Sequence, residues 1–123
     1  YPEWFNPKHM IKNFERSLKN LKSDFVDLIY LHHCNFGKND EHNTSILTRI
    51  SLFHSLGFPI LLGMSRKSLI ASLSNGEPVD KRLPGSLAAA IYAAGQGVQL
   101  LRVHDVSETR QALTIKEALQ CSF

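Results

Sequence analysis

The stretch PILLGMSRKSLIASL, residues 59–73, decides the fold. A proline precedes a short apolar run, Ile60 to Leu62, which predicts a buried strand because its residues are branched and aliphatic. After a short turn, helix-favouring residues run from Lys67 to Leu73. A buried strand followed at once by a helix is the repeating unit of proteins with parallel sheets, so an α/β fold is expected.

Two further apolar runs predict strands on either side of this unit. Phe25 to Leu31 is rich in aromatic and branched residues, and Val98 to Val103 is the third candidate strand. Only Asp27 interrupts the first run, so a strand covered on both faces is expected there.

Apolar residues at helical spacing predict helices between these strands. The first helix opens at Asn6-Pro7, with proline at its first position, and reaches Leu21. The second has its cap at Asn43 or Thr44 and ends at Gly57. The remaining helices are expected over residues 67–73, 84–95 and 105–119.

The predicted order is therefore α-β-α-β-α-α-β-α, with three parallel strands and about five helices. Three strands cannot close an eight-stranded barrel, so the expected sheet is a partial (β/α) barrel-like one with open edges. At 123 residues the chain is predicted to be a single domain. Uncovered apolar faces predict self-association as a homodimer or higher oligomer, and exchange of segments between copies is an open alternative.

Composition and charge exclude several classes of protein. The net charge is only +3 and is spread along the chain, so no nucleic-acid partner is expected. No apolar run approaches the ~20 residues that cross a bilayer, so no membrane partner is expected. Cys34 and Cys121 are far apart, which favours reduced thiols and a cytoplasmic location. The chain begins at Tyr1 without a signal peptide, which is typical of an excised or processed piece.

Two clusters at the ends of predicted strands are candidate anion sites. Ser65, Arg66 and Lys67 open a helix, where backbone amides and two cations suit an anion or a planar acceptor heterocycle. Arg102 and His104 end the last strand, at the edge where parallel sheets bind ligands, and a phosphate or sulfate site is expected there. The structural alternative for the first cluster is a solvated cationic helix start.

Asp105 has a structural role in this prediction. With Glu108 it is expected to form a capping box at the start of the last helix. A local network of Asp105 with Arg102 and His104 is the structural alternative to an anion site, and the two roles are compatible.

Four motifs follow one another in the second part of the chain: FGKNDEHN (Phe36 to Asn43), PILLGMSRKS (Pro59 to Ser68), RLPGSLAAA (Arg82 to Ala90) and RVHDVSET (Arg102 to Thr109). Through these motifs, residues 36–123 resemble the carboxyl-terminal part of dihydropteroate synthase. That family has (β/α)8 barrels that condense a pterin methyl pyrophosphate with p-aminobenzoate in folate biosynthesis. The resemblance implies that Ser65 and Arg66 lie near p-aminobenzoate and that Lys67 contacts the pterin. It also implies that Arg102 and His104 bind the pyrophosphate. No cofactor is expected for this chain.

The first part of the chain contains the stretch FERSLKNLKSDFVDLIYLHHCNFG, Phe14 to Gly37. Through this stretch, residues 1–40 resemble another (β/α)8 family, the aldo-keto reductases. In that family the histidine that ends the strand orients the substrate carbonyl, and here it would be His32. No segment with the family's catalytic tyrosine is present, so His32 is expected to be vestigial. His32 and His33 point to opposite faces of a strand, so no metal site is expected.

Two resemblances in one chain imply an artificial, recombined chimera, aldo-keto-reductase-like over residues 1–40 and dihydropteroate-synthase-like over residues 41–123. Such a chimera is expected to have no evolved catalytic function and not to be an enzyme, because a fold transfers more readily than a site. Leu31 stands where the dihydropteroate synthases have a pterin-binding aspartate. The alternative is a vestigial dihydropteroate synthase fragment that binds pterin pyrophosphate or p-aminobenzoate.

Overall fold

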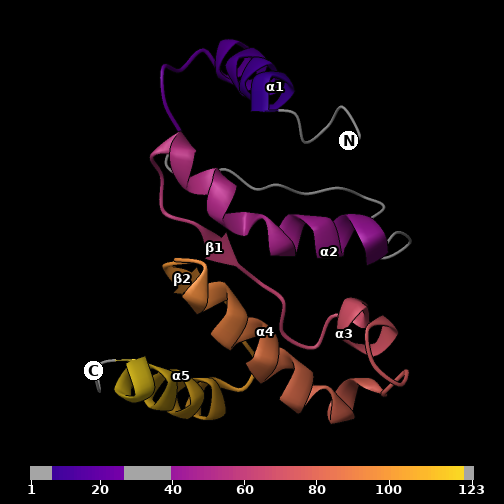
Figure 1. The fold of residues 1–123 in the computed structure, drawn as a ribbon. Coiled ribbons are helices and arrows are strands. Elements are labelled where there is room, and N and C mark those ends of the chain that lie inside the picture. Colours follow the sequence, from indigo (N-terminus) through magenta and orange to yellow (C-terminus); the bar gives the residue numbers. More distant parts are fainter. Residues whose placement is uncertain (1–6, 27–39, 121–123) are drawn as a thin grey trace. The chain divides into compact units, whose positions relative to one another are not determined.

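The structure is a computed structural model that describes residues 7–26 and 40–120 (Figure 1). Contacts within the chain divide it into two compact units, Tyr1–His33 and Cys34–Phe123. The described part of the first unit contains helix α1 (Pro7–Leu21). The described part of the second contains, in chain order, α2 (Asp40–Thr48), the 3-10 helix η2 (Ile50–Leu56), β1 (Leu61–Leu62), α3 (Ser68–Ser72), the 3-10 helix η3 (Val79–Lys81), α4 (Leu83–Gly95), β2 (Leu100–Leu101) and α5 (Val106–Gln120).

Helix α1 forms where the sequence predicts it. It ends at Leu21, and Lys22 follows in the left-handed conformation with a φ of 53°. The N–H of Ser23 then donates to the carbonyl of Leu18 at 3.2 Å. This backbone bond closes the helix in the manner of a Schellman motif, which satisfies one of its last carbonyls.

The predicted first strand, Phe25 to Leu31, lies only partly within the described residues. Phe25 and Val26 belong to no strand there, and Phe25 is 69% exposed. The hydroxyl of Ser23 donates to the Phe25 carbonyl at 2.8 Å and lies 3.4 Å from the Phe25 N–H. Such local bonds compete with strand pairing for the same backbone groups. The rest of that prediction, and His32, lie outside the described residues.

Strand β1 pairs in parallel with β2, with Leu61 opposite Leu100 (Figure 1). The N–H of Leu100 donates to the carbonyl of Ile60 at 3.1 Å. The side-chain oxygen of Gln99 accepts the N–H of Ile60 at 2.8 Å, so a side chain extends the short ladder. The connection between the two parallel strands contains α3, η3 and α4, as expected of an α/β fold.

Both strands are shorter than the predicted runs, which were residues 60–62 and 98–103. The N–H of Val98 donates to the carbonyl of Ala93 at 3.1 Å, so Val98 completes the end of α4 instead of joining the ladder. On the other side, the last ladder bond is donated by the N–H of Arg102. Two residues in each strand remain paired, because these neighbouring bonds take up the flanking backbone groups.

The second predicted helix begins earlier than expected and changes type. A cap was predicted at Asn43 or Thr44, but α2 already begins at Asp40. From Ile50 the chain continues as the 3-10 helix η2. Gly57 ends this segment as predicted, with a φ of 77°, a conformation that glycine adopts without strain.

The core of the second unit lies where η2, α4 and the two strands meet. Ile50, Ala93 and Val98 are buried, and Ala93 has no exposed surface. Four partly buried side chains pack against them: Phe53, Ile60, Leu62 and Leu101. Because Ala93 is small, α4 can approach the strands closely at this contact.

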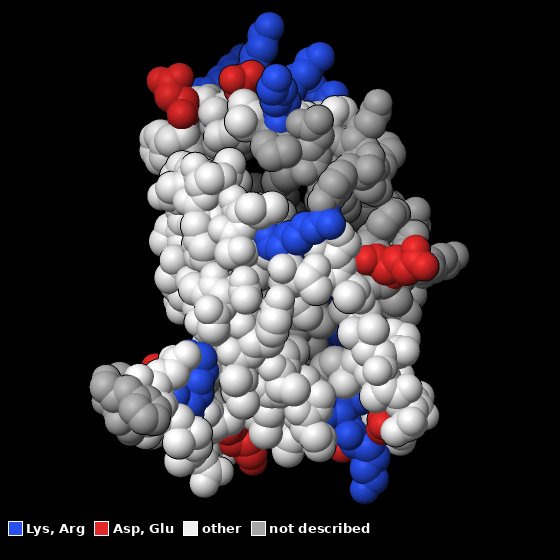
Figure 2. Space-filling view, in the orientation of Figure 1, with Lys and Arg blue, Asp and Glu red and all other residues white. Residues whose placement is uncertain are grey.

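The surface of the described residues fits the charge pattern of the sequence. On the face shown in Figure 2, positive and negative side chains occur near one another in several groups, with uncharged areas between the groups. No helix within residues 7–26 and 40–120 is both long and apolar enough to cross a membrane.

Replacing Gly85 tests the packing of α4 on α3. A Cβ at position 85 would lie 2.3 Å from Cγ2 of Ile70, a stiff, buried, branched side chain. Gly85→Ala should therefore lower the free energy of unfolding by about 1–3 kcal/mol in urea denaturation. Gly95→Ala is the control: its nearest neighbour would be 4.0 Å away, and its stability should hold or rise slightly. Equal unfolding midpoints for the two variants would show that the helices do not pack in this way.

Self-association remains a prediction, and the sheet offers a place to test it. Leu62 and Leu101 face the core, whereas Leu61 and Leu100 are 48% and 51% exposed on the opposite face. Light scattering should give a mass above 13.9 kDa for the chain, and Leu100→Lys should reduce it toward that value. Leu73→Lys, at an exposed position on another element, should leave the mass unchanged. A monomeric mass for the unmodified chain at high concentration would contradict the prediction.

Candidate functional site

The candidate site lies at the carboxyl ends of the two strands, where the turn from Gly63 to Lys67 connects β1 to α3. Arg66 has a φ of 58°, in the left-handed region that costs a residue with a side chain about 1–2 kcal/mol. Lys67 returns to an extended conformation, with a φ of −63° and a ψ of 153°, and precedes α3. Other contacts must therefore hold this turn in its strained conformation.

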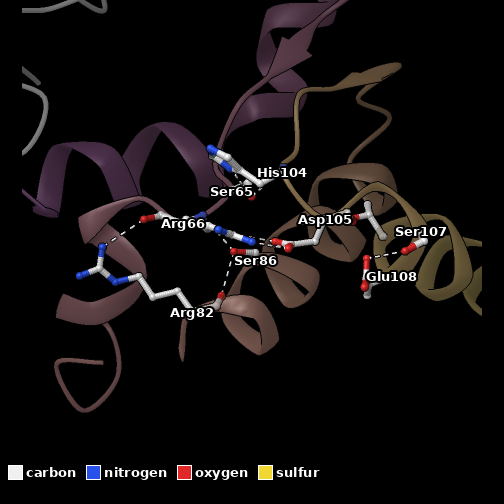
Figure 3. Close-up of polar contacts among 9 residues, drawn as sticks. Ser65, Arg66, Arg82, Ser86, His104, Asp105, Ser107 and Glu108 are labelled. Atoms are coloured by element: carbon white, nitrogen blue, oxygen red, sulfur yellow. Dashed lines mark hydrogen bonds and ion pairs between the residues drawn. The ribbon is translucent and has the colours of Figure 1, made fainter. Parts of the chain in front are cut away.

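Two residues from the start of α4 bind the backbone of Arg66 (Figure 3). Its N–H donates to the hydroxyl oxygen of Ser86 at 3.0 Å, and its carbonyl accepts a hydrogen bond from Nη1 of Arg82 at 3.1 Å. Ser86 is buried and donates its own hydroxyl proton to the carbonyl of Arg82 at 2.8 Å. Arg82 also donates from Nε to the carbonyl of Glu77 at 2.9 Å. The turn is thereby attached to α4.

The side chain of Arg66 forms an ion pair with Asp105, which follows β2 (Figure 3). Nε lies 3.1 Å from one carboxylate oxygen and Nη2 lies 2.5 Å from the other. This two-point geometry is the one in which guanidinium and carboxylate groups bind most strongly. Its hydrogen bond holds the pKa of Asp105 below its ordinary value, and the same bond raises the pKa of Arg66. The carboxylate is therefore charged at neutral pH and cancels the charge of Arg66 locally.

The predicted capping box of Asp105 and Glu108 is wrong. Both carboxylate oxygens of Asp105 bind Arg66 instead of the first turn of α5. Glu108 accepts a hydrogen bond from the hydroxyl of Ser107 at 2.7 Å, which lowers the pKa of Glu108. The hydroxyl of buried Thr109 donates to the Asp105 carbonyl at 2.7 Å. Asp105 therefore binds Arg66, which is distant in sequence, instead of the nearby start of α5.

Ser65 and His104 are brought together across the sheet end. The hydroxyl oxygen of Ser65 accepts the backbone N–H of His104 at 3.2 Å and lies 2.9 Å from Nδ1 of its ring. Ser65 is only 9% exposed, so its hydroxyl serves His104. This bond leaves Nε2 of the exposed imidazole without a hydrogen bond to any described residue. The ring thus presents one nitrogen to the solvent side.

Lys67 and Arg102 are the two remaining predicted residues. Both are exposed, and neither side chain bonds to another residue within the described ranges. Asp105 pairs with Arg66 and not with Arg102, so the local network suggested as an alternative does not include Arg102. The exposed positive charge of the site therefore comes from Lys67 and Arg102. Backbone amides contribute little, because α3 is only five residues long.

Arg82 and Ser86 are the residues that the sequence reasoning missed. Both lie in the motif RLPGSLAAA, in which the sequence alone indicates no role for either side chain. Their spacing could have indicated that they act together. Ser86 follows Arg82 by four residues at the start of a helix, so the two lie on one face.

Apart from this site, the described residues form an open pocket but no cluster suited to a metal ion. An open depression of about 500 Å³ is lined by Glu41, Thr44, Ser45, Thr48 and Leu73, none of which belongs to the cluster. No group of three or more His, Cys, Asp or Glu residues suited to a metal ion occurs among residues 7–26 and 40–120.

Comparison with known proteins gives consistent matches. A family model described as "Pterin binding enzyme" matches residues 13–104. The dihydropteroate synthase of Escherichia coli is 53% identical over 83 residues, which are 68% of this chain and 29% of that protein. The corresponding protein of Haemophilus influenzae is 42% identical over 83 residues, 68% of this chain and 30% of that one. The chain thus spans less than a third of the length of these relatives.

Solved structures agree with the sequence matches. Dihydropteroate synthase of Yersinia pestis in a sulfonamide drug complex aligns with a TM-score of 0.75 at 36% identity, over 94% of this chain and 42% of that one. The Thermus thermophilus enzyme in complex with 4-aminobenzoate aligns with a TM-score of 0.65 at 46% identity, over 72% and 34%. The two parallel strands and their helices are consistent with part of a (β/α)8 barrel.

These matches give no support to a junction between two families near residue 40. The family match begins at residue 13, inside the segment that the sequence analysis assigned to aldo-keto reductases. The alignment with the Yersinia pestis structure covers 94% of the chain. A short helix-and-strand unit recurs in (β/α)8 barrels of different families, so a likeness over one such unit does not by itself indicate a second parent.

The ion pair of Asp105 predicts how stability depends on pH. Because the folded state holds the pKa of this carboxyl below its ordinary 3.8, the pair stabilises the fold above about that pH. The contribution is lost as the pH falls from that value through the lowered pKa. Asp105→Asn should lower the unfolding midpoint at pH 7 and lose less stability than the unmodified chain between about pH 5 and pH 2. Thermal unfolding across this range measures both effects.

Asp80→Asn is the control for this series, since Asp80 is exposed on η3. It should follow the profile of the unmodified chain. If Asp105→Asn also follows that profile at every pH, the ion pair makes no contribution to the fold.

Proposed function

Because this chain belongs to the pterin binding enzyme family, we propose that it provides the carboxyl-terminal ligand-binding edge of a dihydropteroate synthase of folate biosynthesis. The proposal concerns binding, since the chain spans only 29% of the Escherichia coli relative. It corresponds to the second interpretation of the sequence, a dihydropteroate synthase fragment, which the comparisons favour over a recombined chimera without function.

The proposal rests on the charges beyond the ends of the two parallel strands. Two cationic side chains are exposed there, while the charge of a third, Arg66, is neutralised. Lys67 and Arg102 face solvent, and Arg66 is paired with Asp105. A ligand with two or more negative charges suits this arrangement, because a guanidinium and an ammonium can each bind a separate phosphate oxygen. The pyrophosphate of a pterin methyl pyrophosphate has this chemistry.

The remaining contacts follow from the same placement. Arg102 and His104 follow β2 directly and are both exposed, whereas Val103 between them is half-buried, so the two exposed side chains are available to one ligand beyond the strand end. With Nδ1 of His104 held by Ser65, Nε2 can donate to a phosphate oxygen. Lys67, on the connection that follows the neighbouring strand, would then bind the other phosphate, on the side of the pterin.

The p-aminobenzoate side of the site would include Arg66. Its side chain is 39% exposed even while it binds Asp105, so a ligand can still approach it. A carboxylate ligand here would have to approach beside the Asp105 carboxylate, which disfavours a second negative charge. We therefore expect Arg66 to contact the ring or amine of p-aminobenzoate more readily than its carboxylate.

Calorimetry with inorganic pyrophosphate tests the proposal on the intact chain. The unmodified chain should release binding heat that weakens as salt is added. Lys67→Ala and Arg102→Ala should each raise the Kd for pyrophosphate by about five- to tenfold, since each removes one charge-assisted bond. Lys81→Ala, a change of an exposed lysine on η3, should leave the Kd unchanged.

Two results would count against the proposal. The first is no heat above dilution for the unmodified chain. The second is an equal loss for Lys67→Ala and Lys81→Ala, because this would show that pyrophosphate responds to net charge and not to the strand ends.

A further inference from the structure

We infer that Ser86 and Arg82 are positioning residues, which hold the backbone of Arg66 in its left-handed conformation and so place Arg66 and Lys67 for the ligand. The inference rests on the proposed function for the ligand itself. It assigns a role to two side chains that the anion site described above does not use.

The inference is based on a closed ring of three hydrogen bonds that connects Arg66, Ser86 and Arg82 (Figure 3). Arg66 N–H donates to the hydroxyl of Ser86, and that hydroxyl donates to the carbonyl of Arg82. Nη1 of Arg82 then donates to the carbonyl of Arg66, which closes the ring. Both backbone polar groups of Arg66 are thereby bound by side chains from one neighbouring helix start.

Burial makes this ring specific. Ser86 is 6% exposed, so water cannot easily replace its hydroxyl as the acceptor for the Arg66 N–H. A serine hydroxyl has one proton, and here it is given to Arg82 while a lone pair accepts from Arg66. Removing the hydroxyl leaves a part-buried backbone donor without its partner and frees the turn to relax out of its strained conformation.

The three hydrogen bonds affect ligand binding because the backbone conformation of Arg66 sets the direction in which the chain continues to Lys67. The residue after a left-handed position is redirected, and here that residue is Lys67, which stands exposed before α3. The ion pair with Asp105 restrains only the side chain of Arg66, whereas the ring restrains its backbone. Loss of the ring should therefore spread Lys67 over several orientations, and the apparent affinity falls by the fraction that remains competent.

The test compares Ser86→Ala with Ser17→Ala in the intact chain. Both changes remove a hydroxyl that donates to the carbonyl four residues earlier, but Ser17 serves only Asn13 in α1. Two readouts are taken: the backbone carbon chemical shifts of residue 66 by NMR, which report its left-handed conformation, and the Kd for inorganic pyrophosphate.

For Ser86→Ala we expect the shifts of residue 66 to leave the left-handed range and the Kd to rise by about five- to twentyfold. Ser17→Ala should change neither readout. Arg82→Gln shortens the donor that closes the ring and should change both readouts in the same direction, which keeps the test available if Ser86→Ala does not fold.

Two outcomes would overturn the inference. In one, residue 66 keeps its left-handed shifts in both ring variants. In the other, the shifts change but the Kd does not, which would make the ring a structural feature with no effect on the ligand. If the unmodified chain does not bind pyrophosphate, the proposed function fails, and the NMR shifts still decide whether the ring holds Arg66.

Discussion

The structure of the second unit depends on the polar contacts that join the ends of its two strands. The ladder between β1 and β2 pairs only two residues of each strand. Beyond it, Ser65 binds His104, and Arg66 binds Asp105, so side chains continue the link where the backbone ladder stops. The same contacts place the candidate ligand groups. Stability and binding therefore share one set of residues at the carboxyl end of the sheet.

Local patterns in the sequence predicted the helices better than the strands. Pro7 and Gly57 mark helix ends through their own backbone preferences, and the structure confirms both. The extent of a strand depends instead on a partner that local sequence does not reveal, and the run over residues 98–103 was longer than its partner allows. Asp105 shows the same limit, because its predicted partner Glu108 was three residues away and its actual partner Arg66 is 39 residues away.

The candidate site could be predicted in part, because strand ends and a family resemblance both pointed to residues 65–67 and to Arg102 with His104. The resemblance could not show that these residues make different contacts in the folded chain. In the structure Ser65 supports His104, and Arg66 is neutralised, which leaves Lys67 and Arg102 as the exposed charges. Membership of the pterin binding enzyme family gives this charge pattern a ligand class. The strained Arg66 backbone gives it a fixed geometry.

A crystal structure of the chain grown with pyrophosphate would locate the bound anion. We expect it at the carboxyl ends of β1 and β2, within hydrogen-bond distance of Arg102 and His104, with Arg66 still paired to Asp105. Pyrophosphate bound elsewhere, for example in the depression lined by Glu41 and Leu73, with the strand ends empty, would contradict this expectation.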